Sequence, residues 1–474
     1  MSRDVPLCVD LDGTLIHSDL LLESFLLLIK HNPLYLLLVP LWLLKGKANL
    51  KQQIASRVTL DGSALPYTKP LVAWLREEKA RGRSIWLCTA SDERLAQAVA
   101  QHLGLFDGVM ASNGQTNLSG RNKAAAMVAR FGEKGFDYCG NERVDLSVWP
   151  HAAGAVVVNG SAELAQQAAR QTEVVGQYPF RSGGIKVVAK ALRVHQWAKN
   201  ALIFVPVAAA HQLGDLGTLA DSLLAFLAFS LCASSVYLLN DMLDLEADRQ
   251  HHSKCHRPFA AGTLSLLFGL VTAPLLLVVA VALSALLLPT KFLLVLAAYY
   301  VVTLAYSFAL KRMVMVDVLT LAGLYTVRIV AGAAATAIPL TFWLLMFSIF
   351  IFLSLAIVKR YAELLVMKQQ GKLKAKGRGY QVEDLGLLQS LGAASGYLSV
   401  LVLGLYLDTP YIARMYSHPK LVWLLMPIML YWVSRIWMQT HRGNMHDDPL
   451  VYALKDRVSL VTGLMAAVVL ALAV

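Results

Sequence analysis

Three aspartates and an asparagine follow a long apolar run in the middle of the chain. Asp241, Asp244 and Asp248 are spaced i, i+3 and i+7, and Asn240 lies one turn before Asp244. On a helix this spacing directs all four side chains toward nearly one face. Clustered carboxylates repel one another unless a divalent cation lies between them, and hard oxygen ligands favour Mg²⁺, which also binds substrate phosphates. The segment therefore predicts a magnesium-dependent site for a diphosphate.

A basic run follows the aspartates within the same segment. Arg249, Lys254 and Arg257 precede Pro258, which ends it. Arginine and lysine side chains bind phosphate oxygens, so these residues can supply counter-charge for a diphosphate. The alternative is a solvated acidic and basic loop between two membrane helices. Because an arbitrary loop seldom aligns three aspartates on one helical face, a site is the favoured interpretation.

The composition indicates that much of the chain lies in lipid. Of 474 residues, 57% are hydrophobic, and the mean hydropathy is +0.53. The net charge of +12 suits an anionic membrane surface and phosphorylated substrates. Basic and aromatic residues are not interleaved as in nucleic-acid-binding modules. We therefore expect a lipid bilayer and no nucleic acid among the partners, and the sequence leaves homo-oligomerisation open.

Short apolar runs in the first 160 residues alternate with helical segments, which predicts an α/β domain with a Rossmann-like parallel sheet. The expected strands are 5–9, 84–90, 136–140 and 154–160, and the expected helices are 68–81, 91–103, 122–131 and 161–171. Ligands of such sheets bind at the carboxyl ends of the strands. Polar residues stand at those ends: Asp10, Asp12, Thr89, Ser91, Asn141 and Asp145.

This ordered set resembles the haloacid dehalogenase-like phosphatases over about residues 5–175. The matching features are DxDGT at 10–14, Thr89, Lys123 and an acidic fourth motif at 140–145. The resemblance implies that Asp10 is a nucleophile that forms an aspartyl-phosphate and that Asp12 is general acid and then base. It also implies contacts to phosphoryl oxygens by Thr89, Ser91 and Lys123, and Mg²⁺ ligands at Asp10, Asp12 and Asp145.

One position departs from the pattern of that family. Asn141 stands where many relatives carry a second carboxylate, which would reduce metal affinity or turnover. A retained but inactive scaffold is therefore the alternative to an active phosphatase. A lone lysine is more often an ordinary surface residue, and only its place in the ordered set gives Lys123 a predicted role.

A hydrophobic insert occupies residues 15–66, where the phosphatase family carries a cap over its active site. Its apolar runs are broken at four positions: Glu23, Lys30, Pro33 and Pro40. The pieces are shorter than the roughly 20 residues that a spanning helix needs. We therefore expect interfacial helices, with Trp42 and nearby lysines among lipid headgroups. The alternative is a helical cap that packs on itself or on the membrane domain.

Residues 181–474 predict an all-α polytopic membrane domain, separate from the N-terminal domain at 1–180. About nine spans are expected, the first of them short, at 200–214, 219–239, 265–288, 291–309, 317–337, 341–358, 387–407, 420–438 and 458–474. Basic residues gather in the loops after the even-numbered spans. The positive-inside rule places these loops in the cytoplasm. Because Asp4, Asp10 and Asp12 interrupt the first residues, we expect no cleavable signal sequence and an N-terminal domain on the same side. We expect a multi-pass protein of the inner (cytoplasmic) membrane whose active sites face the cytoplasm.

Further polar residues lie at the ends of these spans. Tyr306, Lys311 and Lys359 lie near the ends of the fourth and sixth spans, and Asp317 and Arg328 lie at or inside the fifth. Because ionisable groups within spans are costly, Asp317 and Arg328 are candidates for a site. The alternative is a structural ion pair between helices.

Residues 186–474 resemble the UbiA prenyltransferase superfamily of intramembrane helical enzymes, chiefly through NDxxDxxxD at 240–248. That family generally has a second acidic motif with another aspartate four residues on, but Leu321 takes this place after Asp317. Three segments instead resemble the branch that makes polyprenyl-phosphate phosphoribose: Arg193-x-x-Gln196-Trp197-x-Lys199-Asn200, the run from Asp248 to Gly262, and Asp317 with Arg328-x-x-Ala331-Gly332.

Prenyl transfer and phosphoribosyl transfer both expel diphosphate from a carbon that becomes cation-like. Mg²⁺ held by Asp241, Asp244 and Asp248 would stabilise the departing diphosphate in either reaction. In the phosphoribosyl reaction the acceptor is a lipid phosphate, which is a nucleophile without deprotonation. Cations must then gather two anionic substrates, phosphoribosyl pyrophosphate and a polyprenyl phosphate. The candidate cations are Lys199, Lys311, Arg328 and Lys359.

The presence of both domains in one chain favours the phosphoribosyl reaction. That reaction leaves a 5-phosphate on the ribose, which a phosphatase domain could remove. The hypothesis is therefore a bifunctional membrane enzyme that produces a polyprenyl-phosphoryl ribose. One alternative is a UbiA-type prenyltransferase with an aromatic acceptor and a phosphatase of separate substrate. The non-enzymatic alternative is a polytopic lipid-binding or transport protein.

Overall fold

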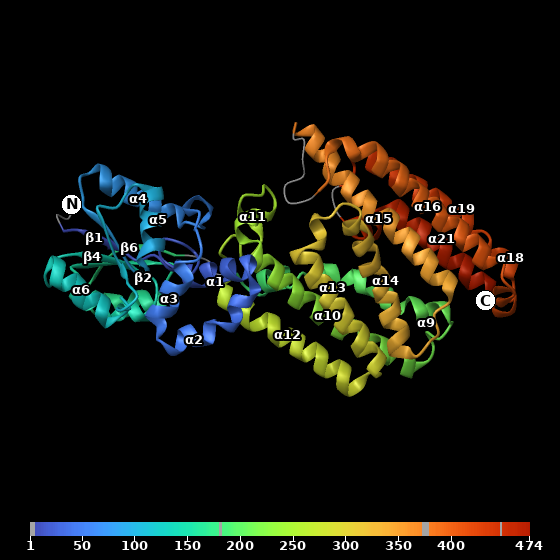
Figure 1. The fold of residues 1–474 in the computed structure, drawn as a ribbon, viewed down its shortest axis with the longest axis horizontal. Helices are drawn as coiled ribbons and strands as arrows, with labels where there is room; N and C mark the ends of the chain where they lie inside the picture. Colours follow the sequence, from blue (N-terminus) through green and yellow to red (C-terminus); the bar gives the residue numbers. More distant parts are fainter. Residues whose placement is uncertain (1–4, 180–182, 372–378, 446–447) are drawn as a thin grey trace. The chain divides into compact units, whose positions relative to one another are not determined.

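The computed structural model describes residues 5–179, 183–371, 379–445 and 448–474 (Figure 1). Two compact units are formed, one by Met1–Leu192 with Tyr237–Ala273 and the other by Arg193–Val236 with Pro274–Val474. The acidic segment 240–248 therefore belongs to the first unit. The predicted domain boundary at 180–181, and part of the basic loop at 372–378, lie outside the described residues.

The first unit is built on a six-stranded parallel sheet, which confirms the predicted α/β class. The strand order is β3-β2-β1-β4-β5-β6. The strands are β1 (Leu7–Val9), β2 (Ile85–Asp92), β3 (Gly108–Ser112), β4 (Asp137–Gly140), β5 (Gly154–Val158) and β6 (Glu173–Tyr178). Strands β3 and β6 were not predicted. Both are edge strands with partly exposed residues, so they lack the continuous apolar signal of a buried strand.

Helices cover both faces of this sheet. They are α4 (Lys69–Ala80), α5 (Glu93–Leu103), α6 (Arg121–Phe131) and α7 (Ala162–Ala169). The short helix α8 (Ile185–Ala191) comes after the last strand in the chain. Short 3₁₀ helices are η2 (Gly62–Ala64), η3 (Arg143–Ser147) and η4 (Trp149–His151). Successive residues of a strand face opposite sides, so Leu7 packs with α4 and α5 while Cys8 packs with α6 and α7.

The insert between β1 and β2 folds into short helices, as predicted. It comprises α1 (Leu20–His31), η1 (Pro33–Leu37), α2 (Val39–Leu44) and α3 (Lys47–Ala55). Trp42 is 9% exposed and packs with Leu28 and Ile54, so it does not project from the surface. Lys51 donates to the carbonyl of Ala90 at 2.6 Å. The expected headgroup contacts of Trp42 and Lys51 are therefore not available in this conformation.

The second half is a helical membrane domain, as predicted. Within the residues that the structure describes, seven helical segments are long and apolar enough to span a bilayer: α10 (Leu216–Leu243), α12 (Leu266–Leu287), α13 (Thr290–Phe308), α14 (Val316–Thr336), α15 (Phe342–Gln369), Val382–Leu407 with η8 (Val382–Asp384) and α16 (Leu385–Leu407), and Pro419–His441 with α18 (Pro419–Val422) and α19 (Leu425–His441). The helices α20 (Pro449–Lys455) and α21 (Arg457–Ala473) are bent by 81° where they meet. If this pair forms one span, the described residues contain up to eight spans. The protein is therefore an integral membrane protein.

The predicted count of nine spans is not confirmed for the described residues, because the first apolar run forms no long helix. Residues Val194–Phe204 form the 3₁₀ helix η5, and Val205–Ala209 form the short helix α9. Pro206 stands at the start of α9 and has no N–H to extend the preceding helix. The other short helices of this half are α11 (Leu245–Arg249), η6 (Lys254–His256), η7 (Leu310–Arg312) and α17 (Pro410–Met415).

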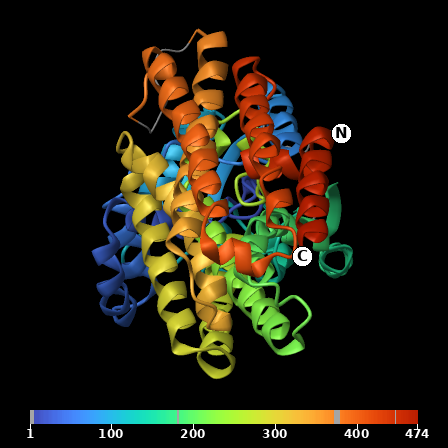
Figure 2. The same cartoon turned by 90° about the vertical axis from the view of Figure 1, so that its right-hand side faces the viewer.

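Small residues allow α15, α16 and α19, in the orange and red part of Figure 2, to pack closely. A Cβ at Gly392 of α16 would lie 2.1 Å from the ring of Trp437 on α19. Ser354 of α15 donates to the Gly392 carbonyl at 2.7 Å and accepts from Trp437 Nε1 at 3.0 Å. Close backbone approach and such hydrogen bonds drive helix association in lipid, where apolar burial contributes little.

The cap exposes a group of leucines that we expect to enter a bilayer. The exposed members are Leu34, Leu36, Leu37, Leu38, Leu41, Leu43 and Leu44, and Leu37 is 74% exposed. A bimane label at Leu37→Cys, in a Cys255→Ser background in which the other cysteines are buried, should be quenched by brominated lipids in nanodiscs, because apolar surface partitions into the interface. The control is Glu163→Cys on α7, which should not be quenched. Equal quenching at both positions would contradict the expectation.

Candidate active sites

Two carboxylates lie at the carboxyl end of β1. Asp10 Oδ1 accepts a hydrogen bond from Lys123 Nζ at 2.7 Å, and both residues are buried. Asp12 Oδ2 accepts from Ser91 Oγ at 2.6 Å. Its Oδ1 accepts from the backbone N–H of Leu20, the first residue of α1, at 2.8 Å. Four predicted residues, from β1, β2 and α6, thus come together at one edge of the sheet.

Burial shifts the protonation of both carboxyl groups. It raises the pKa of Asp10 to about 6, against the opposing attraction of the Lys123 ammonium. Burial, together with repulsion from Asp19, raises the pKa of Asp12 to about 7. A carboxyl group that titrates near neutrality can both donate and accept a proton, which suits the role predicted for Asp12.

A buried network extends from Asp10 to Asp145. Lys123 Nζ donates to Tyr138 OH at 2.9 Å, and Tyr138 OH donates to Asp145 Oδ1 at 2.8 Å. Asp145 Oδ2 accepts from two backbone N–H groups of its own loop, each at 2.9 Å. Sequence reasoning missed Tyr138, because an aromatic residue inside a strand is typical of a core position. It links the predicted lysine to the predicted acidic residue.

Asn141, the position that departs from the phosphatase pattern, faces the loop after β1. Its Oδ1 accepts from Thr14 Oγ1 at 3.0 Å. A side chain at Gly13, whose φ is +71°, would lie 2.1 Å from the Asn141 amide, so glycine is required there on two counts. Thr89 is fully buried, and its Oγ1 accepts from the backbone N–H of Ser91 at 3.0 Å. Thr89 thus holds the end of β2, which carries Ser91.

The raised pKa of Asp12 predicts a pH-dependent stability effect. When the folded-state pKa lies above the unfolded value, the stabilisation is present below the unfolded pKa and is lost as the pH rises through about 7. Asp12→Asn keeps partners for Leu20 and Ser91 but carries no charge. In metal-free buffer it should raise the unfolding temperature at pH 8, and the gain should shrink toward pH 4. The exposed control Asp61→Asn should show no gain, and equal values for Asp12→Asn and wild type at pH 8 would refute the account.

The acidic segment does not form one continuous helix. Helix α10 ends at Leu243 and α11 begins at Leu245, with Asp244 at φ −101° and ψ 16° between them. The predicted single helical face is therefore interrupted. Arg257 Nη1 nevertheless donates to Asp241 Oδ1 at 3.0 Å and to Asp248 Oδ2 at 2.7 Å. Burial raises the pKa of Asp248, and the Arg257 guanidinium opposes that shift.

These residues fit a cation in part. Asp241 and Asp248 converge on one positively charged atom, Arg257 Nη1, as two carboxylates around a metal would. Asp244 turns elsewhere, with its Oδ1 3.5 Å from Lys30 Nζ. Over the parts of the chain that the structure describes, no group of three or more His, Cys, Asp or Glu is arranged to hold a metal ion. Of the three aspartates predicted to bind the metal, two therefore have carboxylates that point toward one position, and the third does not.

The other two residues of the basic run, Arg249 and Lys254, do not bridge the aspartates as Arg257 does. Arg249 forms a two-bonded ion pair with Glu23 of the cap helix, at 2.6 and 2.9 Å. Lys254 lies on η6, and Asn240 lies in the last turn of α10. Arg257 is therefore the member of the run that bridges two of the aspartates.

In the second unit a carboxylate that sequence reasoning missed gathers two predicted lysines. Asp448 Oδ2 accepts from Lys199 Nζ at 2.8 Å and from Lys359 Nζ at 3.2 Å. Tyr325 OH donates to the same carboxylate at 3.0 Å. Asp448 also caps α20 through the N–H of Leu450. Its sequence context is that of an ordinary helix cap, so nothing local indicated a second role.

Arg328 is buried in the same unit. Its Nε donates to Asn200 Oδ1 at 2.8 Å, and Asn200 Nδ2 donates to Ser230 Oγ at 2.9 Å. The guanidinium also lies 5.3 Å from the ring centroids of both Phe229 and Tyr299, within the range of cation–π attraction. Aromatic faces and an amide thus hold Arg328 in place.

Asp317 forms an ion pair, but with Arg360 and not with the predicted Arg328. Arg360 Nη2 donates to Asp317 Oδ1 at 3.0 Å, and Tyr306 OH donates to the same oxygen at 2.8 Å. The structural ion pair that we considered for Asp317 therefore exists with a different arginine. The two remaining predicted basic residues lie at the N-cap of η5, Arg193, and on η7, Lys311.

Residues 201–455, more than half of the chain, match the UbiA prenyltransferase family. The chain belongs to this family. The uncharacterized protein y4nM of Sinorhizobium fredii is 37% identical over 98% of this chain and 90% of its own length. Decaprenyl-phosphate phosphoribosyltransferase of Mycobacterium tuberculosis is 39% identical over 39% of this chain and 62% of its own length. A solved UbiA homolog from Archaeoglobus fulgidus, bound to GPP and Mg²⁺, is 15% identical, with a TM-score of 0.46 over 60% of this chain and 99% of that one.

The Asp448 cluster of this UbiA family member predicts a stability effect. Asp448→Asn removes the charge that two lysines share, while Lys199 stays buried. Breaking a buried ion pair costs about 3–5 kcal/mol. The variant should therefore unfold at a lower temperature in detergent than wild type. Asp408→Asn, at an exposed helix end, is the matched control and should unfold like wild type. If Asp448→Asn and Asp408→Asn unfold at the same temperature, the ion pairs of Asp448 do not contribute to the stability of the protein.

Proposed function

We propose that this UbiA family member is a bifunctional membrane enzyme that transfers phosphoribose from phosphoribosyl pyrophosphate to a polyprenyl phosphate and then removes the 5-phosphate. The observation that carries the transfer step of this proposal is the 39% identity, over 39% of this chain, to a protein named decaprenyl-phosphate phosphoribosyltransferase. The removal of the 5-phosphate is proposed from the residues around Asp10. Leu321, in place of a second-motif aspartate, favours it over transfer of a prenyl group to an aromatic acceptor. The product is a polyprenyl-phosphoryl ribose.

In the transfer step an oxygen of the lipid phosphate attacks the anomeric carbon of ribose, and the bond from that carbon to diphosphate breaks. Two anionic substrates must then be held together, which requires cations. Lys199 and Arg328 are buried, where a charge interacts with phosphate more strongly than in water. We assign these two residues, with the half-buried Lys359, to substrate phosphates.

We assign Asp241 and Asp248 to binding Mg²⁺, with Asp244 as a third ligand. When bound, Mg²⁺ would stabilise the negative charge that develops on the departing diphosphate. Arg257 offsets the mutual repulsion of Asp241 and Asp248, because its Nη1 lies within hydrogen-bonding distance of both. It therefore keeps the two carboxylates together before substrate arrives.

In the hydrolytic step a carboxylate oxygen of Asp10 attacks the phosphorus of the 5-phosphate, and the bond from phosphorus to the sugar oxygen breaks. Asp12 donates a proton to that oxygen, then takes one from the water that attacks the aspartyl-phosphate. Lys123, Thr89 and Ser91 would hold phosphoryl oxygens. Asp10, Asp12 and Asp145 would hold Mg²⁺, which would stabilise negative charge on the phosphoryl group.

We further propose that the protein lies in the inner membrane with both sites on the cytoplasmic side. The support is the excess of lysine and arginine in the loops after α10, α13 and α15, on the side where the positive-inside rule places cytoplasmic loops. Phosphoribosyl pyrophosphate is a soluble, charged substrate, which is consistent with that side.

The proposal is tested by offering detergent-solubilised protein two substrate pairs. One pair is phosphoribosyl pyrophosphate with polyprenyl phosphate, and the other is prenyl diphosphate with an aromatic acceptor. Turnover of the first pair is expected, with release of diphosphate. Turnover of only the second pair would replace the proposal with an aromatic prenyltransferase, and turnover of neither would favour a carrier.

The two activities should separate by mutation. Asp10→Asn removes the attacking carboxylate and should abolish phosphomonoester hydrolysis, but it leaves Asp241 and Asp248 unchanged, so transfer should stay near the wild-type rate. Mass spectrometry should find the phosphoribosyl lipid in the variant and a product lighter by one phosphoryl unit in wild type. If both yield the same phosphorylated lipid, the N-terminal domain is not the matching phosphatase.

A further inference from the structure

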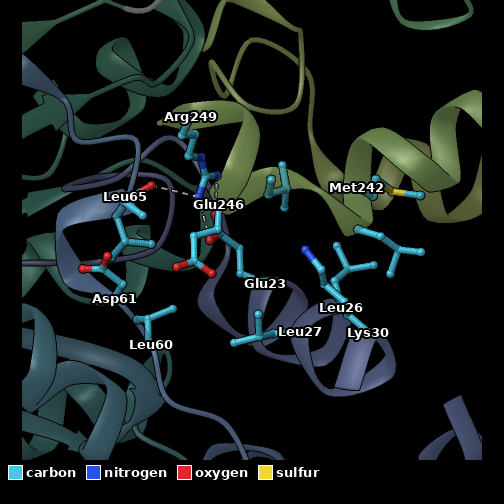
Figure 3. A pocket seen from close by; sticks show the side chains of 13 residues that line it. Glu23, Leu26, Leu27, Lys30, Leu60, Asp61, Leu65, Met242, Glu246 and Arg249 are labelled. Atoms are coloured by element: carbon cyan, nitrogen blue, oxygen red, sulfur yellow. Dashed lines mark hydrogen bonds and ion pairs between the residues drawn. The ribbon is translucent and has the colours of Figure 1, made fainter. Parts of the chain in front are cut away.

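The cap helix α1 lays one stripe of side chains against the segment that carries the acidic motif. Glu23, Leu26, Leu27 and Lys30 are spaced i, i+3, i+4 and i+7, which places them on one face of the helix. These four line a pocket with residues of the segment Met242–Arg249, all within the first unit (Figure 3). The opposite face of α1 packs into the cap core through Leu28, and Leu20, in the first turn, packs into the sheet core.

Glu23 fixes the end of this segment. It binds Arg249 through two N–H groups, and both side chains are less than a tenth exposed. The Arg249 guanidinium also donates to the carbonyls of Ala64 and Ala260 at 3.3 and 3.1 Å. Four of its five N–H groups are thus engaged within the protein. Arg249 holds α11 against the cap helix, so its predicted role as a phosphate ligand is not supported by its contacts.

Lys30 lies two turns further along the same stripe, beside the acidic motif. Its Nζ lies 3.5 Å from Asp244 Oδ1, and the two side chains are 31% and 33% exposed. Figure 3 shows Lys30 extending from α1 on the side of the pocket that faces the motif segment. An ion pair with this exposure is weak and exchangeable, unlike the buried pair of Glu23 and Arg249. The ammonium can therefore leave Asp244 for another anion.

The acidic motif needs such a cation. A diphosphate that approaches three aspartates meets strong repulsion, even with a divalent metal present. Arg257 is already shared between Asp241 and Asp248. Lysine is a flexible point charge with three donors, suited to following a phosphate group as it binds. If Asp244 binds a metal ion instead, Lys30 loses its carboxylate partner. Its ammonium is then next to the diphosphate that the metal binds.

We propose that the cap helix of the N-terminal domain completes the diphosphate site, with Lys30 as a diphosphate-binding residue and the Glu23–Arg249 pair as the clamp that positions it. This inference rests on the proposed function, in which the motif binds a diphosphate. It adds a binding residue from outside the segment that matches the UbiA family. The cap would then serve both reactions, since α1 also donates its first N–H to Asp12.

The test is calorimetric binding of inorganic diphosphate, with Mg²⁺, to the full-length protein in nanodiscs. Lys30→Gln should raise the Kd about tenfold, the loss expected for one charge-assisted contact. Lys45→Gln, an exposed lysine of the same cap outside the pocket, is the matched control and should bind like wild type. Lys30→Arg keeps the charge and should restore most of the affinity.

The sign of the change separates two roles for Lys30. A mere counter-ion of Asp244 would compete with the metal, so Lys30→Gln would then bind magnesium diphosphate as tightly as wild type or more tightly. Either result would overturn the inference while the proposed diphosphate site stands. If wild type itself binds no magnesium diphosphate, the proposed function fails at this site and the inference fails with it.

Discussion

A charge removed from water must be matched by an opposite charge or by hydrogen bonds, and this constraint organises both units. Buried pairs of this kind include Lys123–Asp10, Arg83–Asp137 and Arg249–Glu23 in the first unit and Lys199–Asp448 and Arg360–Asp317 in the second. Each joins segments far apart in the chain. Such a pair therefore commits two elements to one another. The candidate sites contain two of these pairs, Lys123–Asp10 and Lys199–Asp448.

The parallel sheet explains how the N-terminal residues meet. Strand β1 lies between β2 and β4, so its carboxyl end is beside the ends of both neighbours. Asp10 and Asp12 follow β1, Ser91 is the second-last residue of β2, and Asp145 lies on η3, after β4. All parallel strands end at one edge, so residues separated by more than a hundred positions share one small volume.

Helix α1 joins this edge to the acidic motif. Its first N–H binds Asp12, its buried face packs into the sheet and cap cores, and its remaining stripe contacts the end of α10 and α11. A helix is stiff over its 12 residues, so these contacts are held at fixed spacing. The insert therefore covers the sheet and also connects the carboxyl edge of the sheet to the acidic motif.

The residues that surround Asp10 were predicted from the resemblance to the haloacid dehalogenase-like phosphatases. Periodicity and composition were sufficient to predict the parallel sheet, the short helices of the insert and the membrane helices beyond the first short run. These features depend on local patterns of burial, which a sequence displays directly. Tertiary structure decided the break at Asp244, the exchange of Arg328 for Arg360 as the partner of Asp317, and the meeting of Lys199 with Asp448, 249 positions away. The choice among several possible partners depends on which helices become neighbours, and that is set by packing over the whole chain, because no local pattern records it.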